Sequence, residues 1–272
     1  TGVRLDGVSL EQGMAQVDFR KMAQIIEHAQ WQESEAEENY SNLIKDTTMP
    51  GPGLGRASME TGFHARLSQK YVIHFHSLAS LLIYHELNKD KKRVMDWLKS
   101  NTLLKVSFVE ACRPGWILSK KVFGDASIYF LESHGIILQG EDDSILNQWE
   151  KLETTFCKDF SYPDLYDALQ KRLTFEELFE KYGSISIPFR CYFPDIAVFI
   201  DRMNQVLKKN KMGECTFPKE MIAKDRDMAE LWLATVILYK LSPGFPEVPV
   251  GIASTLKDLP TEKIRQQRAK RA

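Results

Sequence analysis

Three histidines and one glutamate are the side chains of this sequence whose types and spacing could do chemistry. His74 and His76 stand two residues apart in a run of β-forming residues, so both imidazoles are expected on one face of a strand. His134 comes directly before Gly135, between two further strand-like runs. Neutral imidazole nitrogens suit zinc and similar divalent cations, and Glu60 could complete such a site or act as a base. A position left open to water or substrate would make the site catalytic.

An ordinary structural role for the same histidines stays open at this point. A His-x-His pair in a strand is not rare, and a histidine beside a glycine can be a core residue that donates to a backbone carbonyl. Spacing by itself does not decide between a metal site and a packed core.

The elements around these residues predict a mixed α and β unit. Ser58 can cap a helix whose first turn holds Glu60. In the following strand, Ile73 and Phe75 face one side while the two histidines face the other. Loop signals are strongest between Thr47 and Gly55, where proline and glycine alternate. The other expected elements are a short strand ending near Val17–Phe19, a helix at Arg20–Glu27, a solvated acidic stretch at Gln32–Asn39, a helix at Ser77–Asn88, strands at Leu104–Val109, Ala126–Leu131 and Ile136–Leu138, and a helix at Ser144–Phe160.

Beyond Pro163 the pattern becomes mainly helical. We therefore place a boundary near Tyr162 and predict two units, residues 1–162 and residues 163–272. No motif in the second unit carries chemistry of its own. Its expected elements are helices at Leu165–Leu169, Phe175–Tyr182, Ile196–Leu207 and Lys219–Leu241 and a strand-like stretch at Ser186–Phe193.

Composition argues against several classes of protein. The chain has 272 residues with a formal net charge of -1, so no overall positive field would gather nucleic acid or an anionic membrane. Its apolar runs fall far short of the ~20 residues that a spanning helix needs. Four scattered cysteines do not make a disulfide framework. We expect a cytoplasmic protein with reduced cysteines and with neither nucleic-acid nor membrane partners.

Three motifs in order resemble the class II aldolase and adducin family. The family pattern is a small residue, then Ser-x-Glu-x-x-x-His, then a hydrophobic residue before His-x-His-Ser, and much later Asn or Ser before His-Gly. The resemblance covers about residues 1–162. The remainder is more loosely similar to the C-terminal extension of longer members related to rhamnulose-phosphate aldolase, through residues 191–195 and 260–265. The three motifs are Ala57–His64, Val72–Ser77 and Ser133–Ile137.

The resemblance implies a three-layer α/β fold, with a central antiparallel sheet flanked by helices and a mainly helical C-terminal extension. It also implies a homotetramer with active sites near subunit interfaces. By the same likeness His74, His76 and His134 would hold zinc or another divalent metal, and Glu60 would be the acid/base. His64 is expected to pack beside the site.

Phosphate binding is implied only in part. Thr1 and Gly2 resemble a turn that holds the substrate phosphate, and Ser58 resembles the first of two serines that do the same. Met59 stands at the second serine and has no hydroxyl. A further phosphate-binding turn of the family would precede Thr1, so we expect a segment upstream of it.

The activity implied by the resemblance is retro-aldol cleavage of a ketose phosphate to dihydroxyacetone phosphate and an aldehyde, with zinc as the Lewis acid. Three alternatives remain open. The same metal ligands support an epimerase or a dehydratase of sugar phosphates. A substrate without phosphate would fit Met59 and the missing turn. An adducin-like binding or scaffold protein would keep the fold without the metal.

Overall fold

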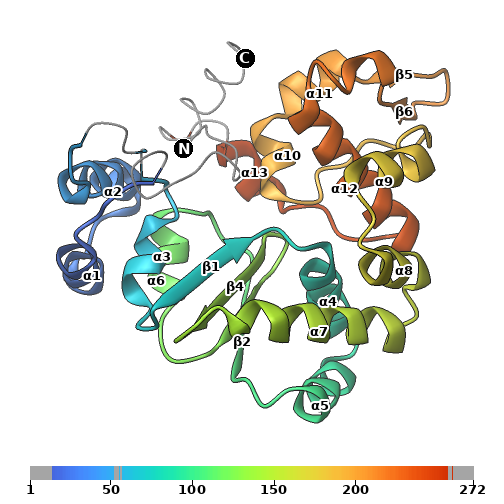
Figure 1. The fold of residues 1–272 in the computed structure, drawn as a ribbon. Helices are drawn as coiled ribbons and strands as arrows, with labels where there is room; N and C mark the ends of the chain where they lie inside the picture. The colour runs from blue at the N-terminus through green and yellow to red at the C-terminus, as the bar shows by residue number, and fades with distance from the viewer. Residues whose placement is uncertain (1–13, 52–54, 56, 257–258, 260–272) are drawn as a thin grey trace.

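A four-stranded mixed sheet forms the centre of the N-terminal part of this computed structural model, which describes residues 14–51, 55, 57–256 and 259 (Figure 1). The strand order is β1-β4-β3-β2. The expected antiparallel sheet is wrong in one pair: β1–β4 and β3–β4 are antiparallel, but β2 and β3 are parallel. Helix α6 lies between β2 and β3 in the chain and supplies the crossover that parallel strands require. The strands are β1 (Tyr71–Phe75), β2 (Val106–Val109), β3 (Ile128–Leu131) and β4 (Gly135–Gly140).

The two central strands are apolar on both faces. In β3, Ile128 and Phe130 belong to one hydrophobic cluster, while Tyr129 and Leu131 belong to another on the opposite face. Ile137 of β4 joins the second cluster. Because side chains alternate along a strand, this division shows that the sheet is buried from both sides.

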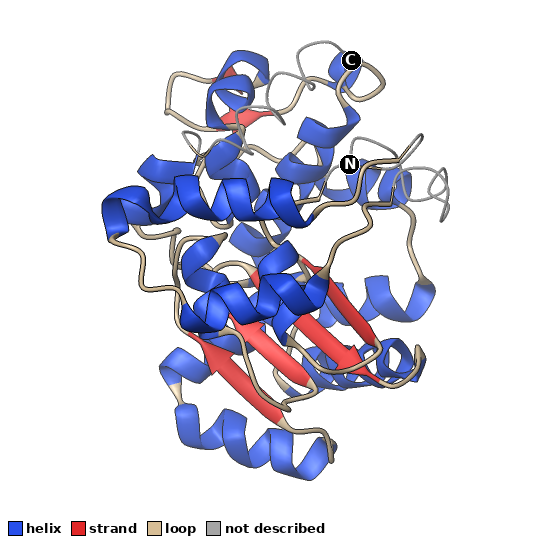
Figure 2. Cartoon of the chain, turned by 90° about the vertical axis from the view of Figure 1, so that its left-hand side faces the viewer, coloured by secondary structure: helices blue, strands red, loops and turns tan. Residues whose placement is uncertain are grey.

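Helices cover both faces of this sheet (Figures 1 and 2). Helices α4 (Leu78–Lys89) and α7 (Ser144–Asp159) supply Leu81, Leu82 and Trp149 to the first cluster. Helices α3 (Thr61–Arg66) and α6 (Trp116–Lys121) supply Phe63 and Leu118 to the second. The mixed α/β class predicted from the sequence is confirmed. Helix α5 (Lys91–Asn101) follows α4 at the edge of this unit.

The acidic stretch at Gln32–Asn39, predicted to be solvated, is instead the first half of helix α2 (Glu33–Thr47). Ala36, Tyr40 and Leu43 are spaced along one side of this helix and are buried, together with residues of α1 (Phe19–His28). The apolar side of this helix was not recognised in the sequence because acidic residues make up most of its exposed side. The expected strand near Val17 is a single bridge between Val17 and Thr48.

The C-terminal part is mainly helical, as predicted, with three corrections. The helix expected at Ile196–Leu207 is divided at Phe199, whose non-helical backbone separates one helix at Pro194–Val198 from another at Ile200–Val206. The stretch Ser186–Phe193 forms no strand; Ile187 makes only an isolated bridge to Cys215. The helix expected at Lys219–Leu241 is split, because the non-helical backbone of Asp225 separates a 3-10 turn at Lys219–Met221 from α12. The elements are α8 (Pro163–Lys171), α9 (Phe175–Tyr182), α10 (Pro194–Val198), α11 (Ile200–Val206), β5 (Lys208–Lys209), β6 (Cys215–Thr216), α12 (Arg226–Leu241) and α13 (Val250–Leu256).

The two parts share a core. The hydrophobic cluster that covers one face of the sheet continues into Tyr192, Ile196 and Leu238 of the C-terminal part. The division into residues 1–162 and 163–272 stays a prediction. No helix among the described residues is long and apolar enough to cross a membrane.

Glu153 of α7 gives the fold a testable pH dependence. Burial raises the pKa of Glu153 from 4.5 to about 7, against the hydrogen bond that it accepts from Ser77. A carboxyl group with a raised folded-state pKa contributes stability below its unfolded pKa and loses that contribution as the pH rises through its folded pKa. We therefore expect the free energy of unfolding to fall between pH 4.5 and about 7. Glu153→Gln should reduce this dependence on pH. Above pH 7, its free energy of unfolding should exceed that of the wild type by about 1–2 kcal/mol.

Urea denaturation at a series of pH values measures this effect. Glu180→Gln, at an exposed carboxylate of the helix Phe175–Tyr182, is the control and should keep the wild-type slope. An unchanged slope in Glu153→Gln would contradict the assignment.

Candidate metal centre

The pairing of β1 with β4 brings three imidazoles together. Phe75 stands opposite Ile136, so the turn that ends in His134 lies beside the C-terminal end of β1. Ser133 in that turn has a φ of 54°, and the left-handed backbone there turns the chain sharply between β3 and β4. The ring centroids of His74, His76 and His134 lie 5.0 to 5.1 Å from one another.

Gly135 permits this close approach of the two strands. A Cβ atom at this position would lie 2.6 Å from the carbonyl oxygen of Phe75 and 3.0 Å from Cα of His76. Its φ of +151° is also one that L side chains rarely adopt. Steric crowding therefore explains why glycine follows His134.

His74 is held with one ring nitrogen facing the cluster. Its Nδ1 donates to the carbonyl oxygen of Ile136 at 2.8 Å, and a carbonyl can only accept. The Nε2 atom is therefore the one with a free lone pair in the neutral ring. This atom is buried and makes no hydrogen bond in the described part of the chain, and its polar neighbour is another acceptor, Oε1 of Glu60 at 3.3 Å. A buried lone pair that faces a carboxylate oxygen is costly unless a cation lies between them, and a metal ion fits that requirement.

Glu60 approaches the imidazoles from a different element, the turn before α3. Its Oε1 lies 3.0 Å from Nε2 of His134 and 3.3 Å from Nε2 of His74. Burial by itself would raise the pKa of Glu60, but attraction to His74 and the hydrogen bond with His134 outweigh it and hold the pKa well below its usual range. The carboxylate is therefore ionised at neutral pH.

Tyr40 of α2 fixes the turn that carries Glu60. Its hydroxyl donates to the carbonyl of Met59 at 2.8 Å and accepts from the amide of Gly62 at 2.9 Å. The Ser119 hydroxyl lies 2.8 Å away and can supply the remaining hydrogen. The single phenol thus satisfies backbone groups on both sides of the glutamate.

His134 is neutral at physiological pH. Burial lowers its pKa to about 4, although contact with Glu60 acts in the opposite direction. Burial also lowers the pKa of His64 to about 4. His64 stacks on Phe63 with ring centroids 4.6 Å apart, as expected for a packing residue beside the site. Neutral imidazoles are the form in which histidine binds a metal.

One nitrogen from each histidine and one oxygen from Glu60 all lie within 4.8 Å of one another. Three imidazoles and one carboxylate suit zinc and related divalent cations. The four residues predicted from sequence to form the site are therefore brought together in space. Their donor set can hold a metal.

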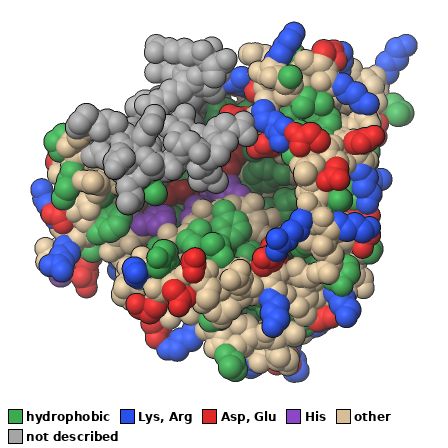
Figure 3. Space-filling model, in the orientation of Figure 1, with side chains coloured by type: hydrophobic (Ala, Val, Ile, Leu, Met, Phe, Trp, Pro, Cys, Tyr) green, Lys and Arg blue, Asp and Glu red, His purple; other side chains and the backbone are tan. Residues whose placement is uncertain are grey.

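The cluster opens into a cavity of about 490 Å³. Figure 3 shows histidine side chains on this face of the molecule, near a hollow with hydrophobic walls. Pro114 lines one wall and Pro194, Val198 and Leu256 of the C-terminal part line another. Glu60 is 23% exposed, so a small molecule can reach it from this cavity.

The structure places only some of the residues that were predicted to bind the substrate phosphate. Thr1 and Gly2 lie outside the described residues. Ser58 lines the cavity, but it does not cap α3, whose N-cap is Glu60; its hydroxyl instead accepts from the Glu60 amide at 3.1 Å. Met59 lines the cavity and is mostly buried in a hydrophobic cluster with C-terminal helices.

Sequence reasoning missed Asp195 at this site. Its Oδ2 lies 2.5 Å from Nδ1 of His76. The sequence showed Asp195 only as part of a stretch similar to the C-terminal extension of longer family members. No spacing rule could have linked it to His76, because the two residues are far apart in the chain and meet only in the folded structure.

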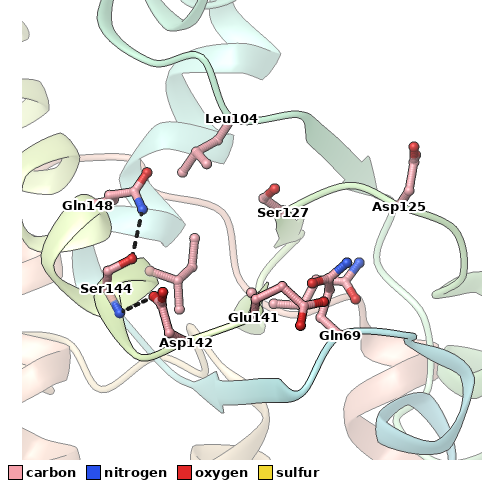
Figure 4. A pocket seen from close by; sticks show the side chains of 11 residues that line it. Gln69, Leu104, Asp125, Ser127, Glu141, Asp142, Ser144 and Gln148 are labelled. Atoms are coloured by element: carbon pink, nitrogen blue, oxygen red, sulfur yellow. Dashed lines mark hydrogen bonds between the residues drawn. The ribbon is translucent and has the colours of Figure 1, made fainter.

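A second hollow of about 290 Å³ lies at the opposite end of the sheet (Figure 4). Several of its polar groups are paired, although Oε1 of Gln139 is buried without a hydrogen bond among the described residues. The amide of Ser144 donates to Asp142, Gln148 donates to the Ser144 hydroxyl, and Asp125 pairs with Lys105. We assign no function to this hollow.

No family model matches the chain, and no curated protein matches it. Among solved structures, the chain is similar to the N-terminal class II aldolase domain of a conserved protein from Thermoplasma acidophilum. The identity is 21% over 59% of this chain and 71% of that one, with a TM-score of 0.46. The name of that domain is that of the family which the three sequence motifs resemble.

Substitution of Gly135 tests the strand approach that assembles the centre. Gly135→Ala places a methyl group against the Phe75 carbonyl, so we expect a loss of about 1–3 kcal/mol in unfolding free energy and weaker binding of divalent metal as His134 moves. Gly244→Ala is the matched control, because Gly244 has a positive φ but nothing within 4 Å of the added Cβ. Calorimetry and metal titration measure both effects. Equal metal affinity in Gly135→Ala and Gly244→Ala would refute the steric argument.

Proposed function

We propose that this protein is a metal-dependent lyase that cleaves a carbon-carbon bond of a ketose phosphate, giving dihydroxyacetone phosphate and an aldehyde. The observation that carries the proposal is the convergence of His74, His76, His134 and Glu60 at an open cavity. The motif order of the sequence supports the choice of reaction, and the buried Nε2 of His74, which makes no hydrogen bond and faces the Glu60 carboxylate, supports a metal.

His74, His76 and His134 would hold the cation, which we propose to be Zn²⁺. When bound, such a cation acts as a Lewis acid that polarises a carbonyl or hydroxyl oxygen of the substrate. Three neutral imidazoles leave its positive charge largely intact. The chain contributes the orientation of these rings, which the Ile136 carbonyl sets for His74.

Glu60 would act as the general acid and base of the reaction. Its ionised carboxylate can accept a proton from the substrate and return it to the carbon from which the bond has broken. The Tyr40 hydroxyl fixes the backbone on both sides of Glu60, so the carboxylate keeps one position during transfer. Pro114, Val198 and Leu256 make the adjoining walls apolar, which limits water around the reacting atoms.

A phosphate group on the substrate stays a proposal that rests on Ser58 and on the resemblance of Thr1 and Gly2. The tetramer is proposed on the same resemblance. An epimerase or dehydratase would use the same metal ligands and differ in its other acid/base groups. A scaffold role is disfavoured, because the buried Nε2 lone pair of His74 faces the Glu60 carboxylate, an arrangement that is costly in a protein that has lost its metal.

Metal content tests the binding half of the proposal. Purified wild-type protein should carry about one equivalent of zinc or another divalent metal per chain, and His74→Ala should carry little, because three ligands are the minimum of such a catalytic site. His85→Ala, a partly buried histidine that stacks on Phe245 away from the cluster, is the matched control. Elemental mass spectrometry measures the ratio. Absence of metal from wild type after reconstitution would overturn the lyase mechanism and favour a scaffold.

Glu60→Gln tests the catalytic half. The amide keeps the shape of the side chain but cannot take up a proton, so aldehyde release from ketose phosphates should fall by about 10²–10⁴-fold while bound metal remains. A coupled assay for the aldehyde gives the rate, and parallel assays for epimer and dehydrated product separate the alternatives. Undiminished aldehyde release would rule out Glu60 as the proton carrier.

A further inference from the structure

Asp195 places a buried carboxylate from the C-terminal part directly behind one of the metal-facing histidines. The residue is only 8% exposed, and its Oδ2 lies 2.5 Å from Nδ1 of His76. A buried carboxylate is costly unless it is paired, and His76 supplies that pairing. The contact links the residue that follows β1 to α10 of the C-terminal part.

Helix α10 is itself firmly anchored. Ile196 is fully buried in the cluster that covers the sheet, while Ala197 and Val198 pack in the cluster of the C-terminal helices. Pro194 at the first helical position suits the start of a helix, because proline has no amide hydrogen to leave unpaired there. The position of Asp195 is therefore set by packing on both sides.

The contact determines which nitrogen His76 offers to the cluster. A carboxylate at Nδ1 makes that nitrogen the donor, so Nε2 keeps its lone pair when the ring is neutral. His74 is oriented in the same way by the Ile136 carbonyl. Two ligands thus have acceptors behind them, one a backbone carbonyl and the other a charged side chain.

We propose that Asp195 is a positioning residue of the metal centre, which holds His76 with Nε2 toward the cation. The C-terminal part is then a component of the site as well as a cover over it. The inference rests on the proposed function in requiring that His76 ligates a metal. Histidine ligands with such a carboxylate partner bind metals more tightly, and loss of the partner costs about 10–100-fold in affinity.

Metal affinity in a double-mutant cycle tests the proposal. We expect Asp195→Ala to weaken Zn²⁺ binding by about 10–100-fold, measured against a chromophoric chelator, and Asp195→Asn to recover part of the loss because its amide oxygen still accepts from Nδ1. In a His76→Ala background, Asp195→Ala should weaken binding no further. Asp225→Ala is the matched control, since Asp225 is also buried and pairs with Arg202 at 2.7 Å in the C-terminal part.

Each outcome of the cycle separates the two proposals. If wild type binds no metal, the proposed function fails. If wild type binds metal but Asp195→Ala binds equally well, or loses affinity equally with and without His76, the positioning role is overturned. A loss matched by Asp225→Ala would likewise overturn it, because general destabilisation would then explain the effect.

A second readout does not depend on metal. Histidine ¹⁵N spectra of the metal-free protein, at a pH where imidazoles are neutral, report which ring nitrogen carries the hydrogen. His76 should carry it on Nδ1 in wild type and lose that preference in Asp195→Ala, while His74 stays unchanged. A His76 spectrum that is the same in both proteins would contradict the proposal.

Discussion

The close antiparallel approach of β1 and β4 is the constraint on which the candidate centre depends. It places the His134 turn against the end of β1, where His74 and His76 already share a face. Because Gly135 has no side chain, the two backbones can come near enough for three imidazoles to meet. A shift of the β1 register by one residue would turn His74 and His76 toward the apolar cluster against which Ile73 and Phe75 pack, so burial of these apolar side chains fixes the register.

Glu60 depends on a separate set of contacts. It lies in a turn before α3 and reaches the imidazoles because Tyr40 of α2 bonds the backbone on both sides of it. The acidic helix α2, which is remote from the chemistry in sequence, thus controls the geometry of the proposed acid/base. The stability of the N-terminal helices and the position of the carboxylate are therefore coupled.

Burial explains the chemical state of the site. It favours neutral His134 and places the Nε2 lone pair of His74 against the Glu60 carboxylate without a hydrogen bond, while the same imidazoles keep Glu60 ionised. Val198 and Leu256 of the C-terminal part add apolar side chains to the lining of the cavity. The side chains of the candidate centre are thus preorganised to bind a cation.

The sequence by itself predicted the mixed α/β class and the four residues that the structure brings together in the candidate centre, because strand alternation and the order of three motifs are local properties. It predicted the faces of β1 correctly, with Ile73 and Phe75 on one side and the histidines on the other. It failed for α2, the parallel pair and Asp195. Only the tertiary structure decided these, since burial of the α2 stripe, the crossover through α6 and the contact of Asp195 with His76 each depend on segments that are distant in the chain.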